Sequence, residues 1–339
     1  MDKIVLALSG GVDSAVAVHL LQEQGYEVYG YTFVNGDDPQ KRKSIIDDAA
    51  AVAEHFGISH YTEDISAEFE DQIVGYFVDR YFEAKTPNPC VYCNKKIKFP
   101  KLLAYADSMG IEKVATGHYV SMKDGMILRA EDKRKDQSYV LSLISEEDYS
   151  RFVFPLGIYE KQEIRKIAEN LGLPVAHKED SQEICFIPND DYKGFLTERY
   201  SDRILGGDFL DTEGSVLGKH KGLPFYTIGQ RRGIGLAFGS PKYVVSLDAE
   251  HNAVIIGDQK DLFSSRCIVK EVNLVGEHSE EFICSVKIRY LSDPVSAKIK
   301  QLKNNRCEVI FDDPQKSITP GQFAVFYDGD LLIGGGEIE

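Results

Sequence analysis

Residues 9–14, Ser-Gly-Gly-Val-Asp-Ser, have the composition of a loop that binds phosphate groups. Glycines let the backbone approach an anion closely, and the hydroxyls of Ser9 and Ser14 can donate hydrogen bonds to phosphate oxygens. An apolar run at 4–8 predicts a buried parallel strand before the loop, and residues 13–24 predict a helix whose N-terminus attracts negative charge. We therefore interpret the segment as a phosphate site rather than as a glycine turn before a capped helix. The GK[ST] element of a Walker loop is missing.

Cys90 and Cys93 form a second candidate site within the segment TPNPCVYC at 86–93. The two prolines predict an extended loop, and the helix after it would direct its N-terminal dipole at the cysteines. Such a dipole lowers the pKa of a thiol and increases its reactive thiolate form. Two packed structural cysteines are the alternative. A four-cysteine zinc site is not favoured, because the chain has no second Cys-x-x-Cys pair.

Four further segments carry polar or reactive side chains that are ordinary when each is taken alone. They are 180–187 (DSQEICFI), 135–139 (KDQSY), 229–233 (GQRRG) and the pair Arg289 and Tyr290. Cys185 in the first segment stands among apolar residues, which is typical of a core position. We expect 135–139 to be a polar loop before a strand, and Arg289 and Tyr290 to be exposed.

Strands and helices alternate in the first part of the chain. Strands are predicted at 4–8, 28–33 and 113–116, and helices at 13–24, 43–56, 99–109 and 160–171, each ended by a glycine at 25, 57, 110 or 172. This alternation predicts an α/β fold with a doubly wound parallel sheet, which holds ligands at the carboxyl ends of its strands. The loop at 9–14 and the pair Gly117 and His118 would then lie at one edge of the sheet.

The sequence changes in character after about residue 203. Glycines become frequent and helical periodicity disappears, and from 265 onward short alternating segments dominate, at 282–288, 307–311 and 323–327. These segments predict a small antiparallel β-barrel. We therefore divide the chain into domains at 1–202, 203–264 and 265–339.

Composition limits the classes of function. The formal net charge of −15 argues mildly against a nucleic-acid partner, although basic residues cluster at 95–98 with Lys101, at 133–135 and at 231–232. Such runs are usually solvated faces. The six cysteines have no disulfide spacing, and no apolar run resembles a secretory signal or a membrane span. We expect a cytoplasmic protein without a membrane partner.

Seven motifs follow one another along nearly the whole chain: SGGVDS, PNPxxxCNKxIKF, ATGHY, KDQSY, DSQEICFI, YTIGQRRGIG and PGQ. Together they resemble the tRNA-specific 2-thiouridylase (MnmA) family, whose SGGxDS loop is that of the PP-loop ATP pyrophosphatases. The resemblance implies a PP-loop domain, a small central domain that contacts tRNA, and a C-terminal β-barrel. It also implies that ATP, with Mg²⁺, adenylylates the C2 oxygen of the wobble uridine in glutamate, glutamine and lysine tRNAs, and that sulfur then replaces this oxygen.

Individual residues match family positions of known role. The positions that contact ATP are Ala7, Leu8, Ser9, Gly10, Gly11, Val12, Asp13, Ser14, Phe33 and Gly117. The positions around the target base are Asn88, Pro89 and Cys90. The positions that contact tRNA are His118, Lys135, Asp136, Gln137, Arg289, Tyr290 and Gln322. Cys93 matches the nucleophile and Cys185 matches the cysteine that carries persulfide sulfur. A sulfur donor, either a persulfide carrier protein or sulfide, is a further expected partner.

Cys90 departs from the family pattern, because the best-known members have an aspartate there that assists proton transfer. A thiol cannot simply replace a carboxylic acid. Cys90, Cys93 and Cys185 could instead hold a 4Fe-4S cluster with one iron open to exogenous sulfide, which is similar to other tRNA-thiolating PP-loop enzymes. The alternative is a persulfide route through Cys93 and Cys185, with Cys90 as a spectator or resolving thiol. We favour the cluster, and spacing alone leaves both routes open.

Two other functions are weighed against thiolation. An amidating synthetase of the PP-loop class would use a nitrogen donor and would not need Cys93 and Cys185. A nucleotide-regulated RNA-binding protein without catalysis would not need an intact loop, and Ser9, Asp13 and Ser14 are all present. Release of pyrophosphate would distinguish the two, because an enzyme of this class releases it and a non-catalytic RNA-binding protein does not.

Overall fold

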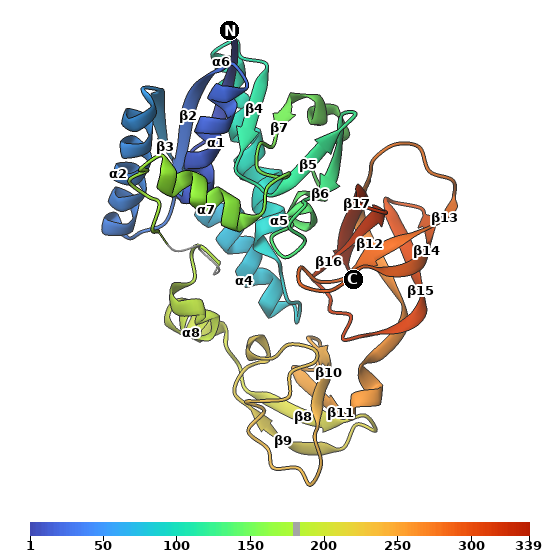
Figure 1. Cartoon of the computed structure of the whole chain (residues 1–339). Helices are drawn as coiled ribbons and strands as arrows, with labels where there is room; N and C mark the ends of the chain where they lie inside the picture. The colour runs from blue at the N-terminus through green and yellow to red at the C-terminus, as the bar shows by residue number, and fades with distance from the viewer. Residues whose placement is uncertain (179–183) are drawn as a thin grey trace. The chain divides into compact units, whose positions relative to one another are not determined.

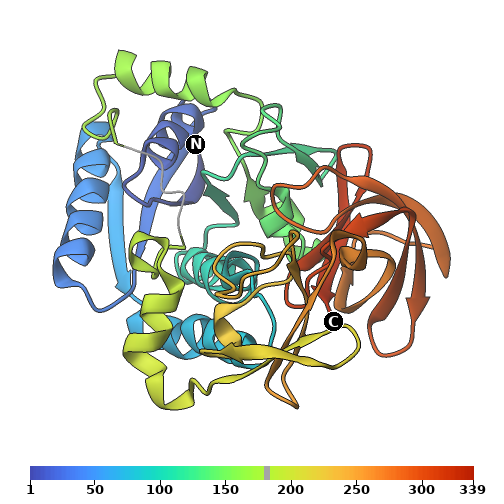
Figure 2. The same cartoon turned by 90° about the horizontal axis from the view of Figure 1, so that it is seen from below.

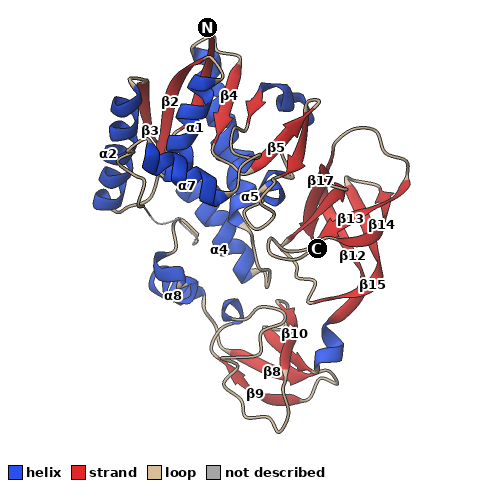
Figure 3. Ribbon diagram, viewed as in Figure 1, coloured by secondary structure: helices blue, strands red, loops and turns tan. Residues whose placement is uncertain are grey.

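A computed structural model describes residues 1–178 and 184–339 (Figure 1). The described residues form two compact units. The first comprises residues 1–73, 90–178 and 330–332, and the second comprises 74–89, 184–329 and 333–339. Both units contain strands, but the helices are concentrated in the first, as the colouring of Figure 3 shows.

A five-stranded sheet is the centre of the first unit. Its order is β3 (Ser59–Asp64), β2 (Tyr26–Val34), β1 (Asp2–Ala7), β4 (Lys113–Thr116) and β7 (Phe152–Val153), and every neighbouring pair is parallel. The chain progresses in opposite directions across the sheet from β1 and from β4. The carboxyl ends of these two strands are therefore the place where such a sheet holds a ligand.

Helices cover both faces of this sheet. Three of them, α1 (Val12–Glu23), α2 (Pro39–Phe56) and α7 (Lys161–Asn170), share one core with Ile4 and Leu6 of β1. Val5 points to the opposite face and is also fully buried, and α6 (Phe99–Ser108) contacts β1 and β4. Figure 2 shows the helices arranged around the strands. The prediction of a doubly wound parallel sheet is confirmed.

The ends of the predicted helices are also confirmed. Gly25, Gly57, Gly110 and Gly172 follow α1, α2, α6 and α7, and all four have positive φ, between 62° and 90°. The beginning of α2 is different from the prediction, since the helix starts at Pro39 rather than at residue 43. Asp38 caps it by accepting hydrogen bonds from the backbone N of Gln40 and Lys41, at 2.8 and 3.2 Å. Proline in the first turn after an aspartate cap is a strong start signal.

Shorter elements connect these strands and helices. They are α3 (Ser66–Phe69), η1 (Glu70–Val74), α5 (Pro89–Cys93), η2 (Asn94–Lys98), β5 (Val120–Lys123), β6 (Met126–Arg129), η3 (Ser138–Leu141) and η4 (Glu146–Arg151). The expectation of a polar loop before a strand at 135–139 is wrong, because the 3₁₀-helix η3 follows the loop. The carboxylate of Asp136 accepts hydrogen bonds from the N and Oγ of Ser138, which favours a helical turn there.

The second unit contains two antiparallel or mixed sheets. A four-stranded sheet has the order β10 (Tyr243–Asp248), β11 (Ala253–Gly257), β8 (Gly207–Asp211) and β9 (Val216–His220). The other strands form a barrel in the order β12 (Phe263–Leu274), β15 (Arg306–Lys316), β14 (Val295–Leu302), β13 (Glu281–Lys287), β16 (Phe323–Asp328) and β17 (Leu331–Ile338). Pairing of β12 with β17 closes it, for example at Val269 and Ile338. The predicted C-terminal β-barrel is confirmed.

The helices of the second unit are short. They are α4 (Gly75–Phe82), η5 (Pro188–Asp190), α8 (Tyr192–Tyr200), η6 (Ser201–Arg203), η7 (Leu223–Phe225) and η8 (Gln259–Leu262). In the described part of the chain, none of the helices has the length and apolar character needed to cross a bilayer.

Candidate active site

The loop at 9–14 connects β1 to α1 at the carboxyl edge of the parallel sheet, as its sequence predicts. The backbone N of Ser9 donates to Oγ of Ser14 at 3.2 Å, and this hydroxyl donates to the carbonyl of Gly11 at 3.1 Å. Gly10 has φ +69°, and a Cβ there would lie 2.8 Å from Cβ of Asp48. The loop is thus folded tightly over α2 in a conformation that requires glycine.

Asp13 is held by two side chains from remote segments. Its Oδ1 accepts hydrogen bonds from the hydroxyl of Tyr119 and from Nζ of Lys161, both at 2.6 Å. Lys178 reaches the other side of the loop, where its Nζ contacts Oδ2 of Asp48 at 2.6 Å and the carbonyl of Gly10 at 3.3 Å. Two lysines therefore border the loop, and cations in this position can stabilise phosphate groups.

Sequence reasoning missed these two lysines and Tyr119. Lys161 begins the amphipathic helix α7, where a polar residue is ordinary, yet its side chain is only 9% exposed because it is paired with Asp13. Nothing in the local sequence marks it, since its partner is 148 residues away. Tyr119 stands in the ATGHY motif, which was a signal that this segment carries more than His118.

The structure brings the other predicted ATP-contacting residues to the same edge. Gly117 directly follows β4, and a Cβ at this position would lie 3.2 Å from the N of Ser14. Phe33 lies near the end of β2, where it makes an edge contact with Tyr31 at 4.8 Å between ring centroids. Leu8 and Val12, which begin and end this turn of the chain, are buried in the core of the first unit. The carboxyl ends of β1, β2 and β4 therefore meet at one site, as the fold requires.

Cys90 and Cys93 lie within a helix rather than before one. The expectation of an extended loop up to the cysteines is wrong, because α5 begins at Pro89 and continues through η2 into α6. Proline is favoured in the first turn of a helix, which explains the early start. Residues three apart lie on the same helix face. Cys90 is exposed and Cys93 is buried, with 5% of its surface accessible.

The helix of the cysteines is tied to the KDQSY segment. Asn94 is 2% exposed, and its Nδ2 donates to the carbonyl of Val140 at 3.0 Å. Asp136 is also buried, and its carboxylate accepts hydrogen bonds from Arg129 Nε at 3.1 Å and from the N of Ser138 at 3.1 Å. Oε1 of Gln137 accepts from the N of Tyr119 at 2.9 Å. Asp136 and Gln137 thus have internal partners, and Lys135 is only partly buried.

His118 is partly buried beside β4. One ring nitrogen, Nδ1, lies 2.6 Å from Oγ1 of Thr116, and its ring tilts against Phe99 at 5.8 Å. Burial, together with the nearby charge of Lys98, lowers the pKa of His118 to about 3. The imidazole is therefore neutral at neutral pH. It can donate or accept a hydrogen bond but cannot act as a cation.

Cys185 lies in the second unit and is exposed, not in a core as its apolar neighbours suggested. The rings of Phe77 and Phe195 hold its neighbour Phe186, with centroids 5.1 and 6.0 Å away. Residues 180–183 of the DSQEICFI motif lie outside the described residues. Among the residues that the structure describes, no three His, Cys, Asp or Glu side chains are grouped in a manner suited to a metal ion.

The remaining predicted residues of the second unit have protein partners. Arg289 and Tyr290 are partly buried, so the expectation that they are exposed is wrong. Nη2 of Arg289 donates to the carbonyl of Ser317 at 2.9 Å. Nε2 of Gln322 donates to the carbonyl of Thr86 at 2.8 Å, two residues before Asn88. The internal partners come from segments remote in sequence, which is why spacing did not reveal them.

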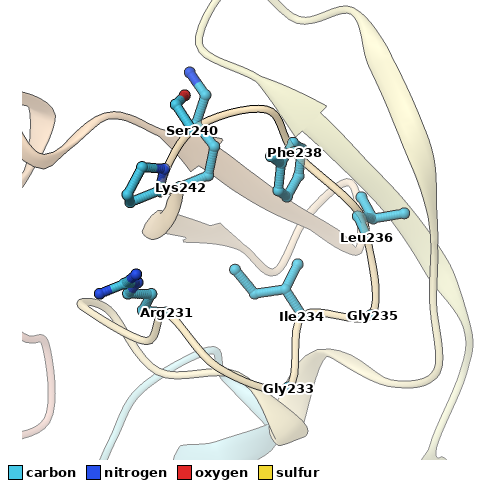
Figure 4. Close-up of a pocket in the computed structure, with 9 residues that line it drawn as sticks. Arg231, Gly233, Ile234, Gly235, Leu236, Phe238, Ser240 and Lys242 are labelled. Carbon is cyan, nitrogen blue, oxygen red and sulfur yellow. The ribbon is translucent and has the colours of Figure 1, made fainter.

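A basic loop in the second unit surrounds a hollow of about 210 Å³ (Figure 4). Arg231 and Lys242 line it together with Ile234, Leu236 and Phe238. The loop belongs to a longer stretch, 214–247, that contains no Asp or Glu and carries Lys219, Lys221, Arg231, Arg232 and Lys242. Both arginines are exposed. This stretch is locally cationic in a chain whose net charge is −15.

Comparisons with known proteins cover the whole chain. Three family models match it: the tRNA methyl transferase HUP domain at residues 2–189, the tRNA methyl transferase PRC-barrel domain at 193–258, and the aminomethyltransferase beta-barrel domain at 264–338. A protein of Clostridium botulinum named tRNA-specific 2-thiouridylase MnmA 2 is 44% identical over 99% of this chain and 98% of its own length. One of Caldanaerobacter subterraneus, named tRNA-specific 2-thiouridylase MnmA 1, is 44% identical over 100% of this chain and 98% of its own length.

The chain is also distantly similar to a solved structure. A 4-thiouridine synthetase in complex with RNA and ATP is 19% identical and covers 52% of this chain and 43% of that chain, with a TM-score of 0.36. We draw no functional conclusion from a similarity of this size.

Proposed function

Since the chain belongs to the tRNA-specific 2-thiouridylase MnmA family over its full length, we propose that it is an ATP-dependent tRNA-uridine 2-sulfurtransferase. The product would be 2-thiouridine at the wobble position of glutamate, glutamine and lysine tRNAs, with AMP and pyrophosphate released. One observation is the main support for this reaction. A tight Ser-Gly-Gly loop, bordered by Lys161 and Lys178, lies at the carboxyl ends of β1 and β4, where the strand order of the parallel sheet reverses. We expect the enzyme to work in the cytoplasm.

The first chemical step activates the base. The C2 oxygen of uridine attacks the α-phosphorus of ATP, and pyrophosphate leaves with the electrons of the broken P–O bond. The residues of the loop at 9–14 would bind the phosphates, and Lys161 and Lys178 would offset the charge that develops on pyrophosphate. Mg²⁺ would supply further charge at the same place. Asp13 fits as a ligand, because Tyr119 and Lys161 both donate to its Oδ1, and among the described residues its Oδ2 accepts no hydrogen bond.

The second step brings sulfur to the activated carbon. A sulfur nucleophile attacks C2, and the former C2 oxygen leaves as part of AMP. A 4Fe-4S cluster, if bound by Cys90, Cys93 and Cys185, would present sulfide for this attack, and we favour this assignment over persulfide transfer. In support, Cys90 and Cys93 stand three residues apart in one helix, and this spacing directs two thiols to the same side.

The persulfide route is the second candidate for this step. Here Cys185 would carry the transferred sulfur and Cys93 would release it by forming a disulfide with Cys185. The exposure of Cys185 favours this route, because a sulfur carrier protein must reach the thiol that it loads. Anaerobic purification, reconstitution with iron and sulfide, and an absorbance spectrum with iron analysis distinguish the two. A wild-type protein that binds no iron and thiolates from a persulfide donor, with Cys90→Ala fully active, would exclude the cluster.

The tRNA is expected to bind to basic residues that cluster locally. The stretch 214–247, free of acidic residues, supports this expectation for Arg231 and Arg232. Lys95, Lys96, Lys98, Lys135 and Arg289 are the other basic residues in the family-like motifs. An electrostatic contribution of this kind is compatible with a net charge of −15, because binding depends on where the charges lie.

One experiment tests the proposed function as a whole. Purified protein is incubated with ATP, Mg²⁺, a sulfide source and tRNA that was transcribed in vitro and lacks modifications. Pyrophosphate and 2-thiouridine are then measured in the same reaction. Pyrophosphate should form only with ATP, Mg²⁺ and tRNA that has uridine at the wobble position, and 2-thiouridine should require the sulfide source as well. Pyrophosphate without thiouridine, under every sulfur donor, would point to an amidating enzyme instead.

A further inference from the structure

Thr86 lies where three remote segments of the second unit meet. Its backbone N donates to the carbonyl of Pro320 at 2.8 Å, and its carbonyl accepts from Nε2 of Gln322 at 2.8 Å. Its Oγ1 donates to Oγ1 of Thr227 at 3.3 Å. The partners are 141 and 236 residues away in sequence for the two side-chain contacts. The main chain and the hydroxyl of Thr86 are thus all bonded to the central loop or to the barrel.

The turn at 319–322 approaches this segment very closely. Gly321 has φ +88°, and a Cβ there would lie 2.9 Å from Cβ of Lys85 and 3.0 Å from the N of Thr86. Any other residue would push the two segments apart. The structural role of the PGQ motif is therefore to pack against residues 85–86, because its proline, glycine and glutamine each contact that segment.

Arg289 forms hydrogen bonds with both segments that contact Thr86, the turn of the barrel and the central loop. Its Nη2 donates to the carbonyl of Ser317 at 2.9 Å, to Oγ1 of Thr319 at 2.8 Å and, more weakly, to the carbonyl of Ile228 at 3.4 Å. Ser317 and Thr319 precede Pro320, and Ile228 follows Thr227. One guanidinium therefore connects the turn of the barrel with the central loop that contacts Thr86.

We propose that Gln322 and Arg289 are positioning residues, which fix Thr86 and thereby orient Asn88 and Pro89, two of the positions that the family resemblance places around the target base. This role rests on the proposed function. For Gln322 it replaces the contact with tRNA that the family resemblance implies, and for Arg289 it is added to that contact. Thr86 and Asn88 each precede a proline, and Pro87 and Pro89 have fixed φ angles, so the backbone from 86 to 89 has little freedom. An orientation set at Thr86 is therefore passed to Asn88 and to the first residue of α5.

The first test separates positioning from RNA contact. Gln322→Met keeps the length and the apolar part of the side chain but removes the amide donor. Turnover should fall about tenfold or more, because displacement of a reacting group by a fraction of an ångström is costly, while the Kd for tRNA stays within about twofold. Gln301→Met is the matched control, since Nε2 of Gln301 also donates to a backbone carbonyl in the barrel, that of Ser279 at 3.0 Å. It should leave turnover unchanged.

The opposite pattern overturns the proposal. If Gln322→Met raises the Kd and KM for tRNA and leaves kcat unchanged, Gln322 contacts RNA. Arg289→Lys provides a second distinction, because lysine keeps the charge but not the planar group that reaches three acceptors. Under the proposal it loses turnover as severely as Arg289→Ala. Restoration of both turnover and tRNA affinity by lysine would show that only the charge matters.

A measurement without turnover keeps this inference separate from the proposed function. Hydrogen exchange of the peptide that contains Thr86 is compared among the wild type, Gln322→Met and Gln301→Met. Exchange should be faster in Gln322→Met alone, because the bond from Thr86 N to Pro320 loses its neighbouring support. Equal exchange in all three proteins would refute positioning by Gln322. Absence of thiolation by the wild type would refute the proposed function and leave this result unaffected.

Discussion

At the residue scale, Asp13 is the side chain whose role in ATP chemistry is most directly testable. Asp13→Ala should reduce tRNA-dependent pyrophosphate release by about 100-fold or more, because the loop loses its only acidic group and the carboxylate that holds Lys161 beside it. Pyrophosphate is measured in a coupled assay at saturating ATP. Normal release by the variant would mean that the loop at 9–14 does not bind the phosphates.

Asp13→Asn is the control for folding. Its amide oxygen still accepts hydrogen bonds from Tyr119 and Lys161, so the buried lysine keeps a polar partner. Asp13→Ala removes the acceptor of both hydrogen bonds and should lose about 1–3 kcal/mol of unfolding free energy. If both variants fail in turnover but only Asp13→Ala is destabilised, the catalytic and structural roles of Asp13 are separated.

His118 makes the stability of the protein depend on pH. Its pKa in the folded chain is about 3, lowered by burial and by Lys98, against 6.5 for the ordinary side chain. Between these values the unfolded chain binds a proton that the folded chain does not, so stability decreases as the pH falls from 6.5 toward 3. His118→Gln should remove about 1–2 kcal/mol of the loss between pH 7 and pH 5, measured by urea unfolding. An identical loss in both proteins would contradict the low pKa.

At the scale of elements, the loop between β1 and α1 depends on Gly10. Gly10→Ala forces a Cβ to within 2.8 Å of Asp48 in α2 and places alanine at positive φ. It should cost about 2–3 kcal/mol of stability and remove most ATP use. Gly25→Ala is the matched control, because Gly25 has φ +90° but open space around it. Its cost should be about 1 kcal/mol, with ATP use retained. Equal effects of both would show that the clash is unimportant.

The cysteines divide by the element that carries them. Cys93 is the last residue of α5 and Cys185 is exposed, whereas Cys267, Cys284 and Cys307 lie in the barrel strands. Burial raises the pKa of each barrel thiol to about 12, so all three are protonated and unreactive at neutral pH. Cys93→Ser and Cys185→Ser should bring thiouridine in cellular tRNA near zero. Alanine variants of the barrel cysteines should retain it, and substantial thiolation by Cys93→Ser would exclude its assigned role.

At the scale of the whole molecule, the prediction concerns charge and salt. Affinity for tRNA should fall steeply as salt rises, and each phosphate contact contributes about 0.7–0.9 to the slope of log K against log salt. Arg231→Gln and Arg232→Gln should each reduce the slope by about that amount. Lys303→Gln, which removes an exposed charge in the barrel, is the control and should leave the slope unchanged. An affinity that does not depend on salt would refute binding through these residues.

Elements with local signals could be predicted from the sequence alone. The apolar run of β1, the glycines at the ends of four helices and the alternation in β13, β15 and β16 each depend on residues close in the chain, so fold class and barrel are confirmed. The phosphate loop belongs to the same group, because strand, glycines and helix are contiguous. The division into domains at 202 and 264 stays a prediction.

Tertiary structure alone decided which side chains face each other. The partner of Asp13 is Lys161, 148 residues later, and the partner of Thr86 is Gln322, 236 residues later. No local pattern records such a pair, because it exists only when the sheet, the central loop and the barrel have folded. The same reason explains why Arg289 is partly buried rather than exposed, and its expected contact with tRNA stays a prediction, as does that of Asp136. The hydrogen-bond partners of Arg289 lie 28 to 61 residues away in sequence, whereas those of Asp136 lie only 2 to 7 residues away. Both sets are needed, since a buried polar group must be hydrogen-bonded.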